Sequence, residues 1–253
     1  MFPDIHFNLL GHEINIFTYS LFMAVGFLVF FYELEKHIKK DTFFENEVEN
    51  IRLVVTFTFI FGFICAGILP NFIFKNFSGY FLVYSVMPGF LMGSVFFLLS
   101  LKLIQINAFK WSNILIPFWC YTHAWGRLGC FFAGCCFGKK TDLFLGVSFN
   151  NEFFKDEIGE GIAVHPTQLY ESLILFFLGF ILKRFIPINF RVSFFLVLYG
   201  SSRFIIEFIR YEIYQPNINF YNLTSSQLFS IIYALLGFIL FLKIFRKNSY
   251  KNI

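Results

Sequence analysis

Residues 193–209 read Ser-Phe-Phe-Leu-Val-Leu-Tyr-Gly-Ser-Ser-Arg-Phe-Ile-Ile-Glu-Phe-Ile, an apolar run that nevertheless carries Arg203 and Glu207. A helix that crosses a membrane needs roughly 20 mostly apolar residues, so this run predicts a membrane helix. A charged side chain at the centre of such a helix costs about 2.5 to 3.5 kcal/mol or more, and ionisable residues there usually act in function. Arg127 and Glu171 lie in or at the edge of similar runs. These four residues are therefore the first functional candidates.

The composition extends this prediction to the whole chain. Its 253 residues are 57% hydrophobic, 23% aromatic and 14% charged, which is typical of a protein built for lipid. Apolar stretches of this kind occur near residues 14–32, 52–70, 80–101, 113–135, 167–182, 193–209 and 225–242. We therefore predict an all-α membrane protein with seven transmembrane helices, forming a single integral membrane domain over residues 1–253. Two longer connections remain, an inner loop from Glu33 to Arg52 and an outer one from Cys136 to Pro166. The outer loop, between the fourth and fifth helices, predicts a small extracytoplasmic head.

The distribution of basic residues predicts the orientation. With the helices alternating in direction, one side holds most of the lysines and arginines, namely Lys36, Lys39, Lys40, Arg52, Lys102, Lys110, Lys183, Arg184, Arg191, Lys243, Arg246, Lys247 and Lys251. The other side holds Lys75, Lys139, Lys140, Lys155 and Arg210. The richer side is expected to be cytoplasmic, so the N-terminus lies outside and the C-terminus inside. No basic residue precedes the first apolar stretch, so we expect it to remain as a helix rather than to be removed as a signal peptide.

The net charge of +4 indicates which classes of partner to expect. It is accounted for by the cytoplasmic anchors, which favour anionic membrane lipids. No basic stripe interleaved with exposed aromatic residues indicates a nucleic acid partner, and we expect none.

The predicted topology places the polar residues at one depth. Because a helix rises about 1.5 Å per residue, Tyr19, Arg127, Glu171, Arg203 and Glu207 all fall in the outer half of the bilayer. Tyr199 and Arg210 share a helix face with Arg203 and Glu207, since the four are spaced by four, four and three residues. This pattern predicts a pocket open to the outer leaflet and lined by guanidiniums and carboxylates.

Arginine carries a planar, permanently charged fork that suits phosphate. Arg127 and Arg203 at head-group depth therefore predict binding of a phospholipid head group. The alternative is a structural ion pair between Arg203 and Glu207, which would leave Arg127 unexplained.

Three other ionisable residues have plainer alternatives. Glu171 follows Pro166 and Thr167, which suit a helix start, and a carboxylate in a first turn also favours the helix dipole. His165 is a candidate base near neutral pH, although a histidine in a loop is more often a hydrogen-bonding surface residue. His123, one turn before Arg127, is best interpreted as a core residue.

The chain has five cysteines, at positions 65, 120, 130, 135 and 136. Cys130, Cys135 and Cys136 have the spacing C-x4-C-C, which lacks the paired C-x2-C pattern of structural zinc sites. Packing of small residues is the favoured interpretation, with a disulfide on an oxidising outer face as an alternative. We expect neither a metal nor another cofactor.

Four blocks of sequence resemble those of the prolipoprotein diacylglyceryl transferases. Gly126 to Gly138, Gly-Arg-Leu-Gly-Cys-Phe-Phe-Ala-Gly-Cys-Cys-Phe-Gly, is similar to a variant of that family's signature. His165 to Glu171 resembles its H-P-S/T-Q-L-Y-E block, Tyr199 to Arg210 its Y-G-x-x-R-F-x-x-E-x-x-R block, and Leu223 to Leu228 the segment before its last helix. The blocks keep the family's order over nearly the whole chain.

The resemblance implies an enzyme of the bacterial inner membrane that moves the diacylglyceryl group of phosphatidylglycerol onto the lipobox cysteine of a preprolipoprotein. The signal peptide of that substrate would be a partner, and glycerol phosphate would leave. Matched residue by residue, Arg127 and Arg203 would hold the phosphate, and Tyr19 and Tyr199 would order the head group. Glu207 would orient Arg203, and Gln168 and Arg210 would join the substrate-binding residues.

The chain departs from the family's pattern at the base that assists the substrate thiol. The H-G-G-L-x-G block should fall near Met87 to Gly93, which contains no histidine, and the signature's asparagine and glutamate are replaced by Cys130 and Cys135. Either His165 or Glu171 would then take the role of base, or this branch of the family has another activity.

Two other classes of function fit parts of the sequence. A small transporter or phospholipid-binding membrane protein would use the same charges along a permeation path, but the inner halves of the helices are almost uniformly apolar. A thiol-redox membrane protein would depend on Cys135 and Cys136.

Overall fold

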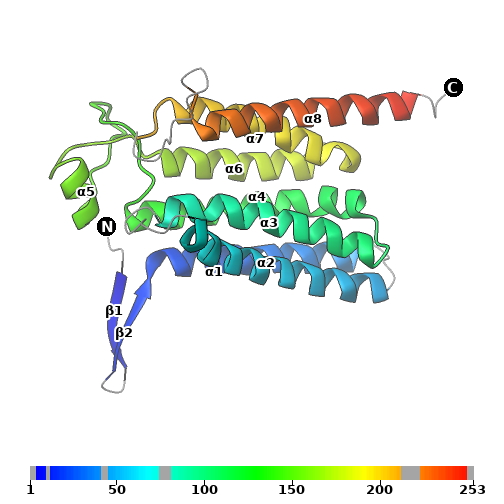
Figure 1. The fold of residues 1–253 in the computed structure, drawn as a ribbon, viewed down its shortest axis with the longest axis horizontal. Helices are drawn as coiled ribbons and strands as arrows, with labels where there is room; N and C mark the ends of the chain where they lie inside the picture. The colour runs from blue at the N-terminus through cyan, green and yellow to red at the C-terminus, as the bar shows by residue number, and fades with distance from the viewer. Residues whose placement is uncertain (1–3, 10–11, 41–44, 74–80, 212–222, 250–253) are drawn as a thin grey trace. The chain divides into compact units, whose positions relative to one another are not determined.

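The computed structural model describes residues 4–9, 12–40, 45–73, 81–211 and 223–249 (Figure 1). The chain begins with two strands, β1 (Asp4–Leu9) and β2 (His12–Phe17). The helices that follow are α1 (Thr18–Lys40), α2 (Glu45–Ile73), α3 (Phe81–Leu103), α4 (Ala108–Ala133), α5 (Glu152–Glu157), α6 (Thr167–Arg184), α7 (Arg191–Glu207) and α8 (Ser225–Ser249). A short 3-10 turn, η1 (Ile188–Phe190), leads into α7.

The long helices lie where the apolar stretches predict them. Each predicted stretch coincides with one of α1, α2, α3, α4, α6, α7 and α8, so the chain is predominantly helical as expected. Within the described residues, Glu45–Ala66 and Ser225–Lys247 are long and apolar enough to cross a membrane by length and composition. The number of helices that cross the membrane stays a prediction.

Two boundaries were predicted wrongly. Residues 14–17 belong to β2, which pairs antiparallel with β1 from Asp4 opposite Phe17 to Leu9 opposite His12, so the first helix begins only at Thr18. The inner loop is also shorter than predicted, because α1 continues to Lys40 and α2 begins at Glu45. Charged residues such as Glu and Lys are good helix formers, so a helix can continue past the end of its apolar run.

The described chain forms two compact units. The first comprises residues 1–34 and 112–253, and the second comprises residues 35–111. In the second unit, α2 and α3 pack at a close contact of glycines, where a methyl group added to Gly89 would lie 2.6 Å from the carbonyl oxygen of Gly62. The Arg52 guanidinium donates to both carboxylate oxygens of Glu35, at 2.7 Å each.

The first unit is held together by close helix contacts and by hydrogen bonds between helices. A Cβ at Gly200 would lie 2.8 Å from the carbonyl oxygen of Ser230, so α7 and α8 meet backbone to backbone. Thr122 on α4 donates its hydroxyl to the carbonyl oxygen of Gly26 on α1 at 3.0 Å. Ser172 on α6 donates to the carbonyl oxygen of Ala124 on α4, also at 3.0 Å. These contacts join α7 to α8, α4 to α1 and α6 to α4.

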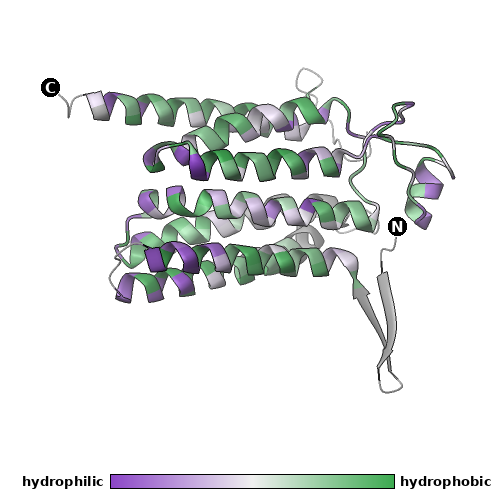
Figure 2. Ribbon diagram, turned by 180° about the vertical axis from the view of Figure 1, so that it is seen from behind, coloured by the Kyte–Doolittle hydropathy of each residue, from purple (hydrophilic) through white to green (hydrophobic). Residues whose placement is uncertain are grey.

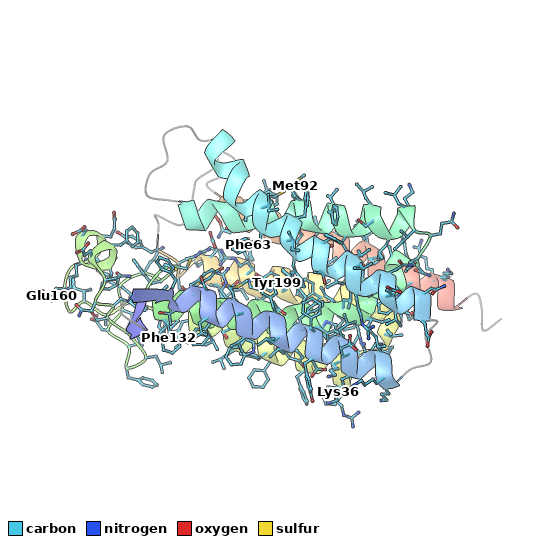
Figure 3. All side chains as sticks on the ribbon, turned by 90° about the horizontal axis from the view of Figure 1, so that it is seen from below. Lys36, Phe63, Met92, Phe132, Glu160 and Tyr199 are labelled. Atoms are coloured by element: carbon cyan, nitrogen blue, oxygen red, sulfur yellow. The ribbon has the colours of Figure 1, made fainter. Side chains whose placement is uncertain are left out.

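Residues 134–166, which we call the outer segment, have a small core of their own. Phe137, Phe149 and Phe154 are buried and their rings meet at centroid distances of 5.0 to 6.0 Å. The Asn151 amide donates to the carbonyl oxygens of Ala133 and Gly134, so it joins α5 to the end of α4. On the exposed side, Lys155 pairs with Glu160, which is labelled in Figure 3.

Candidate active site: a buried cluster of arginines and glutamates

Five charged side chains from three parts of the first unit come together in one cluster. Arg127 lies on α4, Glu171 on α6, Arg203 and Glu207 on α7, and Arg210 just after α7. Their side chains are 15%, 4%, 6%, 0% and 7% exposed, respectively. We call these residues the ion cluster.

Glu171 lies between two arginines. Its Oε1 is 3.0 Å from Nη2 of Arg127, and its Oε2 is 3.9 Å from Nη1 of Arg203. Tyr199, labelled in Figure 3, donates its hydroxyl to Oε1 of Glu171 at 2.9 Å. Both carboxylate oxygens therefore face cationic or hydroxyl donors, an arrangement that fixes the orientation of the carboxylate.

Glu207 forms the second centre of the cluster. Its Oε2 is 2.8 Å from Nη2 of Arg203 and 3.9 Å from Nη1 of Arg210. The Thr224 hydroxyl donates to Oε1 of Glu207 at 3.1 Å, and Arg203 Nη2 donates to the Ser226 hydroxyl at 3.4 Å. The ion pair between Arg203 and Glu207 that the sequence offered as an alternative is thus present, but it is one part of a larger network.

Two guanidiniums of the ion cluster keep hydrogen-bond donors that no described residue uses. In the part of the chain that the structure describes, the cluster joins the guanidiniums of Arg127, Arg203 and Arg210 to the carboxylates of Glu171 and Glu207. Among the described residues, Arg127 Nε and Arg203 Nη1 are buried nitrogens without a hydrogen-bond partner. Buried guanidiniums with unused donors favour an anionic ligand, and their geometry suits the oxygens of a phosphate.

Gln168 and its neighbour Thr167 bind the backbone that follows α4. The Thr167 hydroxyl donates to the carbonyl oxygen of Cys136 at 2.8 Å, and the Gln168 amide donates to that of Cys135 at 2.6 Å. The Gln168 Oε1 is buried and has no hydrogen-bond partner among the described residues. The amide nitrogen of Gln168 positions the start of the outer segment. The role of this residue in binding the substrate stays a prediction.

The two histidines and Tyr19 lie around the cluster in different ways. His165 Nδ1 is 3.4 Å from the Tyr170 hydroxyl, and within the described part of the chain no ion pair or hydrogen bond joins it to the ion cluster. The His123 ring packs edge-on against Tyr199, with centroids 5.7 Å apart. Tyr19 packs on Gly129, where an added Cβ would be 3.2 Å from its ring. Tyr19 thus packs against α4 at a position two residues after Arg127.

Thr224, Ser226 and Gln227 were not assigned a role from the sequence. Thr224 precedes α8, its hydroxyl accepts from the Gln227 backbone at 3.1 Å, and the Gln227 side chain accepts from the Thr224 backbone at 3.1 Å. This is a capping box, and the pattern Thr-x-x-Gln before an apolar run could have indicated it. Its contact with Glu207 could not be predicted, because it depends on the packing of α7 against α8.

Comparison with known proteins identifies the family of the chain. The sequence profile described as prolipoprotein diacylglyceryl transferase matches residues 4–243. A phosphatidylglycerol–prolipoprotein diacylglyceryl transferase of Clostridium tetani is 31% identical, over 93% of this chain and 95% of its own length. Its counterpart in Francisella tularensis is 30% identical, over 95% of this chain and 94% of its own, and a second Clostridium enzyme, from C. perfringens, is 25% identical over 90% and 91%. The resemblance predicted from the four sequence blocks is therefore confirmed: the chain belongs to the prolipoprotein diacylglyceryl transferase family.

Proposed function

We propose that this protein transfers the diacylglyceryl group of phosphatidylglycerol to the lipobox cysteine of preprolipoproteins, and that the ion cluster binds the phosphate. Membership of the family and the names of relatives that match over nearly their full length support the reaction and both substrates. The observation that carries the site is a pair of buried guanidinium nitrogens, Arg127 Nε and Arg203 Nη1, which have no hydrogen-bond partner among the described residues and could donate to the phosphodiester oxygens of phosphatidylglycerol.

The geometry suggests a separate role for each residue of the ion cluster. The reaction breaks the bond between the diacylglycerol carbon and a phosphate oxygen, so negative charge grows on the departing glycerol phosphate. Arg127 and Arg203 would stabilise that charge, since preorganised cations act most strongly where water is excluded. Glu171 and Glu207 would hold the two guanidiniums in place, and Tyr199 would fix Glu171 through the 2.9 Å hydrogen bond. Arg210 and Gln168 would complete the binding surface for the substrate, and Tyr19 would order the head group.

The proposed base is His165 rather than Glu171. Glu171 already accepts a hydroxyl hydrogen bond and faces two guanidiniums, so taking a proton would break a buried ion pair. His165 is half-buried and its Nδ1 lies 3.4 Å from the Tyr170 hydroxyl, an arrangement compatible with proton transfer.

We further propose that the chain lies in the bacterial inner membrane as one multi-pass domain, with α1, α2, α3, α4, α6, α7 and α8 as the seven spans. Apolar residues along α6, α7 and α8 and hydrophilic residues near the end of α8 support this placement (Figure 2). The distribution of basic residues favours an outside N-terminus and a cytoplasmic C-terminus. The outer segment would then form the extracytoplasmic head.

Complementation tests the function directly. The gene is expressed in cells depleted of their own diacylglyceryl transferase, and a reporter lipoprotein is examined by mass spectrometry. We expect the diacylglyceryl mass on the lipobox cysteine with the wild-type protein and with Arg246→Ala, an exposed arginine at the end of α8. Arg203→Ala should give no modification at equal expression. A well-expressed wild-type protein that leaves the reporter unmodified would disprove the assignment.

A further inference from the structure

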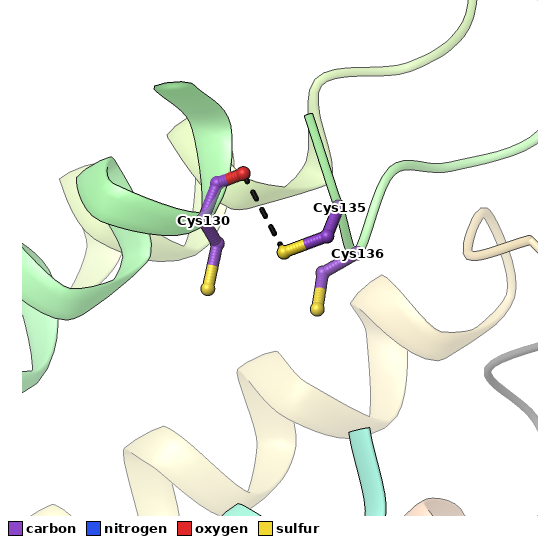
Figure 4. Close-up of side chains that lie close together, drawn as sticks. All are labelled: Cys130, Cys135 and Cys136. Carbon is purple, nitrogen blue, oxygen red and sulfur yellow. Dashed lines mark hydrogen bonds between the residues drawn. The ribbon is translucent and has the colours of Figure 1, made fainter. Parts of the chain in front are cut away.

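Three cysteine thiols meet at the end of α4. The Sγ atoms of Cys130, Cys135 and Cys136 all lie within 4.8 Å of one another, and all three cysteines are free (Figure 4). Cys130 is in the last turns of α4, and the other two follow Gly134, where the chain leaves the helix. Cys130 and Cys135 are half-buried and Cys136 is buried, so the group is shielded without being sealed.

The backbone is bent to bring these thiols together. Gly134 has a φ of +69° and Cys136 a φ of +62°, and a left-handed conformation is uncommon for a residue other than glycine. The carbonyl oxygens of Cys135 and Cys136 are held by side chains of α6, the amide of Gln168 and the hydroxyl of Thr167. The Cys135 thiol donates weakly to the Cys130 carbonyl oxygen at 3.7 Å. A strained backbone maintained by two hydrogen bonds from another helix is typical of a functional site.

The number of the thiols and their closeness in space favour a metal ion over a disulfide. A disulfide would use two of the cysteines and leave the third unexplained. A tetrahedral zinc ion with bonds of about 2.3 Å to sulfur sets its sulfur ligands about 3.8 Å apart, so small side-chain rotations from the observed cluster would suffice. Among the described residues the group offers these three ligand atoms, which leaves one position of a tetrahedron open. Three protein ligands with an open position are typical of catalytic rather than structural zinc.

We propose that Cys130, Cys135 and Cys136 bind a thiophilic divalent cation of the zinc class, whose open position takes the substrate thiol. The inference rests on the proposed function, because it concerns how the lipobox cysteine becomes a nucleophile. A thiol bound to such a cation loses its proton, and the thiolate is the reactive form.

The thiol cluster lies beside the ion cluster. Cys130 is three residues after Arg127 on α4, so the two side chains share a helix face. On α6, Gln168 holds the Cys135 carbonyl and Glu171, three residues later, pairs with Arg127. A thiolate on the metal and a phosphate on the arginines would therefore be neighbours, as a displacement between them requires.

The cation would act as a Lewis acid and would not be consumed in the reaction. The substrate S–H bond gives its proton to water, directly or through His165. The sulfur electron pair forms the new bond to the diacylglycerol carbon, and the pair of the broken C–O bond leaves with glycerol phosphate. The resulting thioether is a poorer ligand than a thiolate, so the product can dissociate.

Titration of the full-length protein with cobalt and zinc tests the site. The protein is purified in detergent under reducing conditions, stripped with a chelator, and titrated with Co²⁺ while absorption from sulfur-to-cobalt charge transfer is followed. The test variant is Cys130→Ser/Cys135→Ser/Cys136→Ser, and the matched control is Cys65→Ser/Cys120→Ser, which leaves the cluster intact. We expect one equivalent of Co²⁺ with thiolate absorption in the wild type and the control, and none in the test variant. Equal binding by the test variant, no binding by the wild type, or a disulfide within the cluster under these conditions would overturn the proposal.

A second measurement needs only the wild type, in case the triple variant does not fold. Bound Zn²⁺ should protect Cys130, Cys135 and Cys136 from alkylation, as mapped by mass spectrometry. Alkylation of all three at the rate of the stripped protein contradicts the site.

A third measurement concerns transfer itself. Stripped protein should transfer diacylglyceryl at least tenfold more slowly at neutral pH, and should recover on adding Zn²⁺ or on raising the pH toward that of free thiol ionisation. Transfer unchanged by stripping overturns the role of the cation in activating the thiol. Failure of the wild type to transfer with or without metal would instead count against the proposed function, while the titration would still decide the metal site.

Discussion

Arg127 on α4 and Glu171 on α6 are joined by an ion pair, with Nη2 of Arg127 3.0 Å from Oε1 of Glu171. Both side chains are largely buried, at 15% and 4% exposure. Such a pair adds little stability compared with apolar residues in its place, because the cost of removing two charges from water offsets most of their attraction. Its presence is better explained by a need for a positioned guanidinium than by a need for stability.

Arg127→Ala is therefore expected to abolish transfer and also to destabilise the fold. Removing one partner leaves the Glu171 charge buried, which costs about 3 to 5 kcal/mol in comparable cases. Activity is measured with phosphatidylglycerol and a lipoprotein peptide, and stability by thermal unfolding in detergent.

The double variant Arg127→Ala/Glu171→Gln separates the two effects. It removes the unpaired charge, so it should regain much of the lost stability while remaining inactive. A double variant that recovers both stability and transfer would show that Arg127 has only a structural role.

Tyr199→Phe should keep the fold and lower the rate. The change removes the hydroxyl that donates to Glu171 at 2.9 Å but preserves the stacking of the ring on Phe195, at a centroid distance of 5.3 Å. A hydrogen bond to a charged group contributes about 1.5 to 3 kcal/mol, so we expect transfer to fall roughly tenfold or more. Steady-state kinetics with variable phosphatidylglycerol would check this. Phe195→Leu is the control for lost ring packing, and an equal loss of activity there would argue against the hydrogen bond.

Thr224→Ala should be more harmful than Thr224→Ser. The alanine variant loses the cap of α8, worth about 1 kcal/mol, and also the hydroxyl that donates to Glu207. Serine keeps both hydrogen bonds. We expect reduced transfer and a lower unfolding temperature for alanine and near wild-type values for serine. Equal transfer by both variants would mean that the contact with Glu207 does not help to position Arg203.

Gly200→Leu should prevent α7 and α8 from packing. A Cβ at this position would lie 2.8 Å from the Ser230 carbonyl oxygen, and backbone at that distance cannot move aside easily. Because α7 carries Arg203 and Glu207, we expect loss of folded protein as well as of transfer, measured by size-exclusion recovery from membranes. Ser201→Leu, on an exposed position of the same helix, is the matched control and should fold normally.

The helices could be predicted from the chain because their apolar runs are long and unbroken, and length alone distinguishes such runs from strands. Helix ends were less predictable. Residues 14–17 share the apolar character of α1 but pair with β1. The apolar run itself does not show that a strand outside it will pair with its first residues. The end of α1 at Lys40 also lies beyond its apolar run, because polar residues continue a helix once it has formed.

The candidate site also has some features that the sequence predicts and others that it does not. By itself the sequence determined which charged residues stand out, namely Arg127, Glu171, Arg203 and Glu207, because a charge within an apolar run is costly to remove from water and can be recognised without knowing its partners. Only the tertiary structure decided their partners: that Glu171 joins two arginines from different helices, that Thr224 supports Glu207, and that Cys130, Cys135 and Cys136 converge. The physical reason is that ion pairs, hydrogen bonds and metal ligands act over a few ångströms, and the packing of distant segments alone sets which atoms come within that reach.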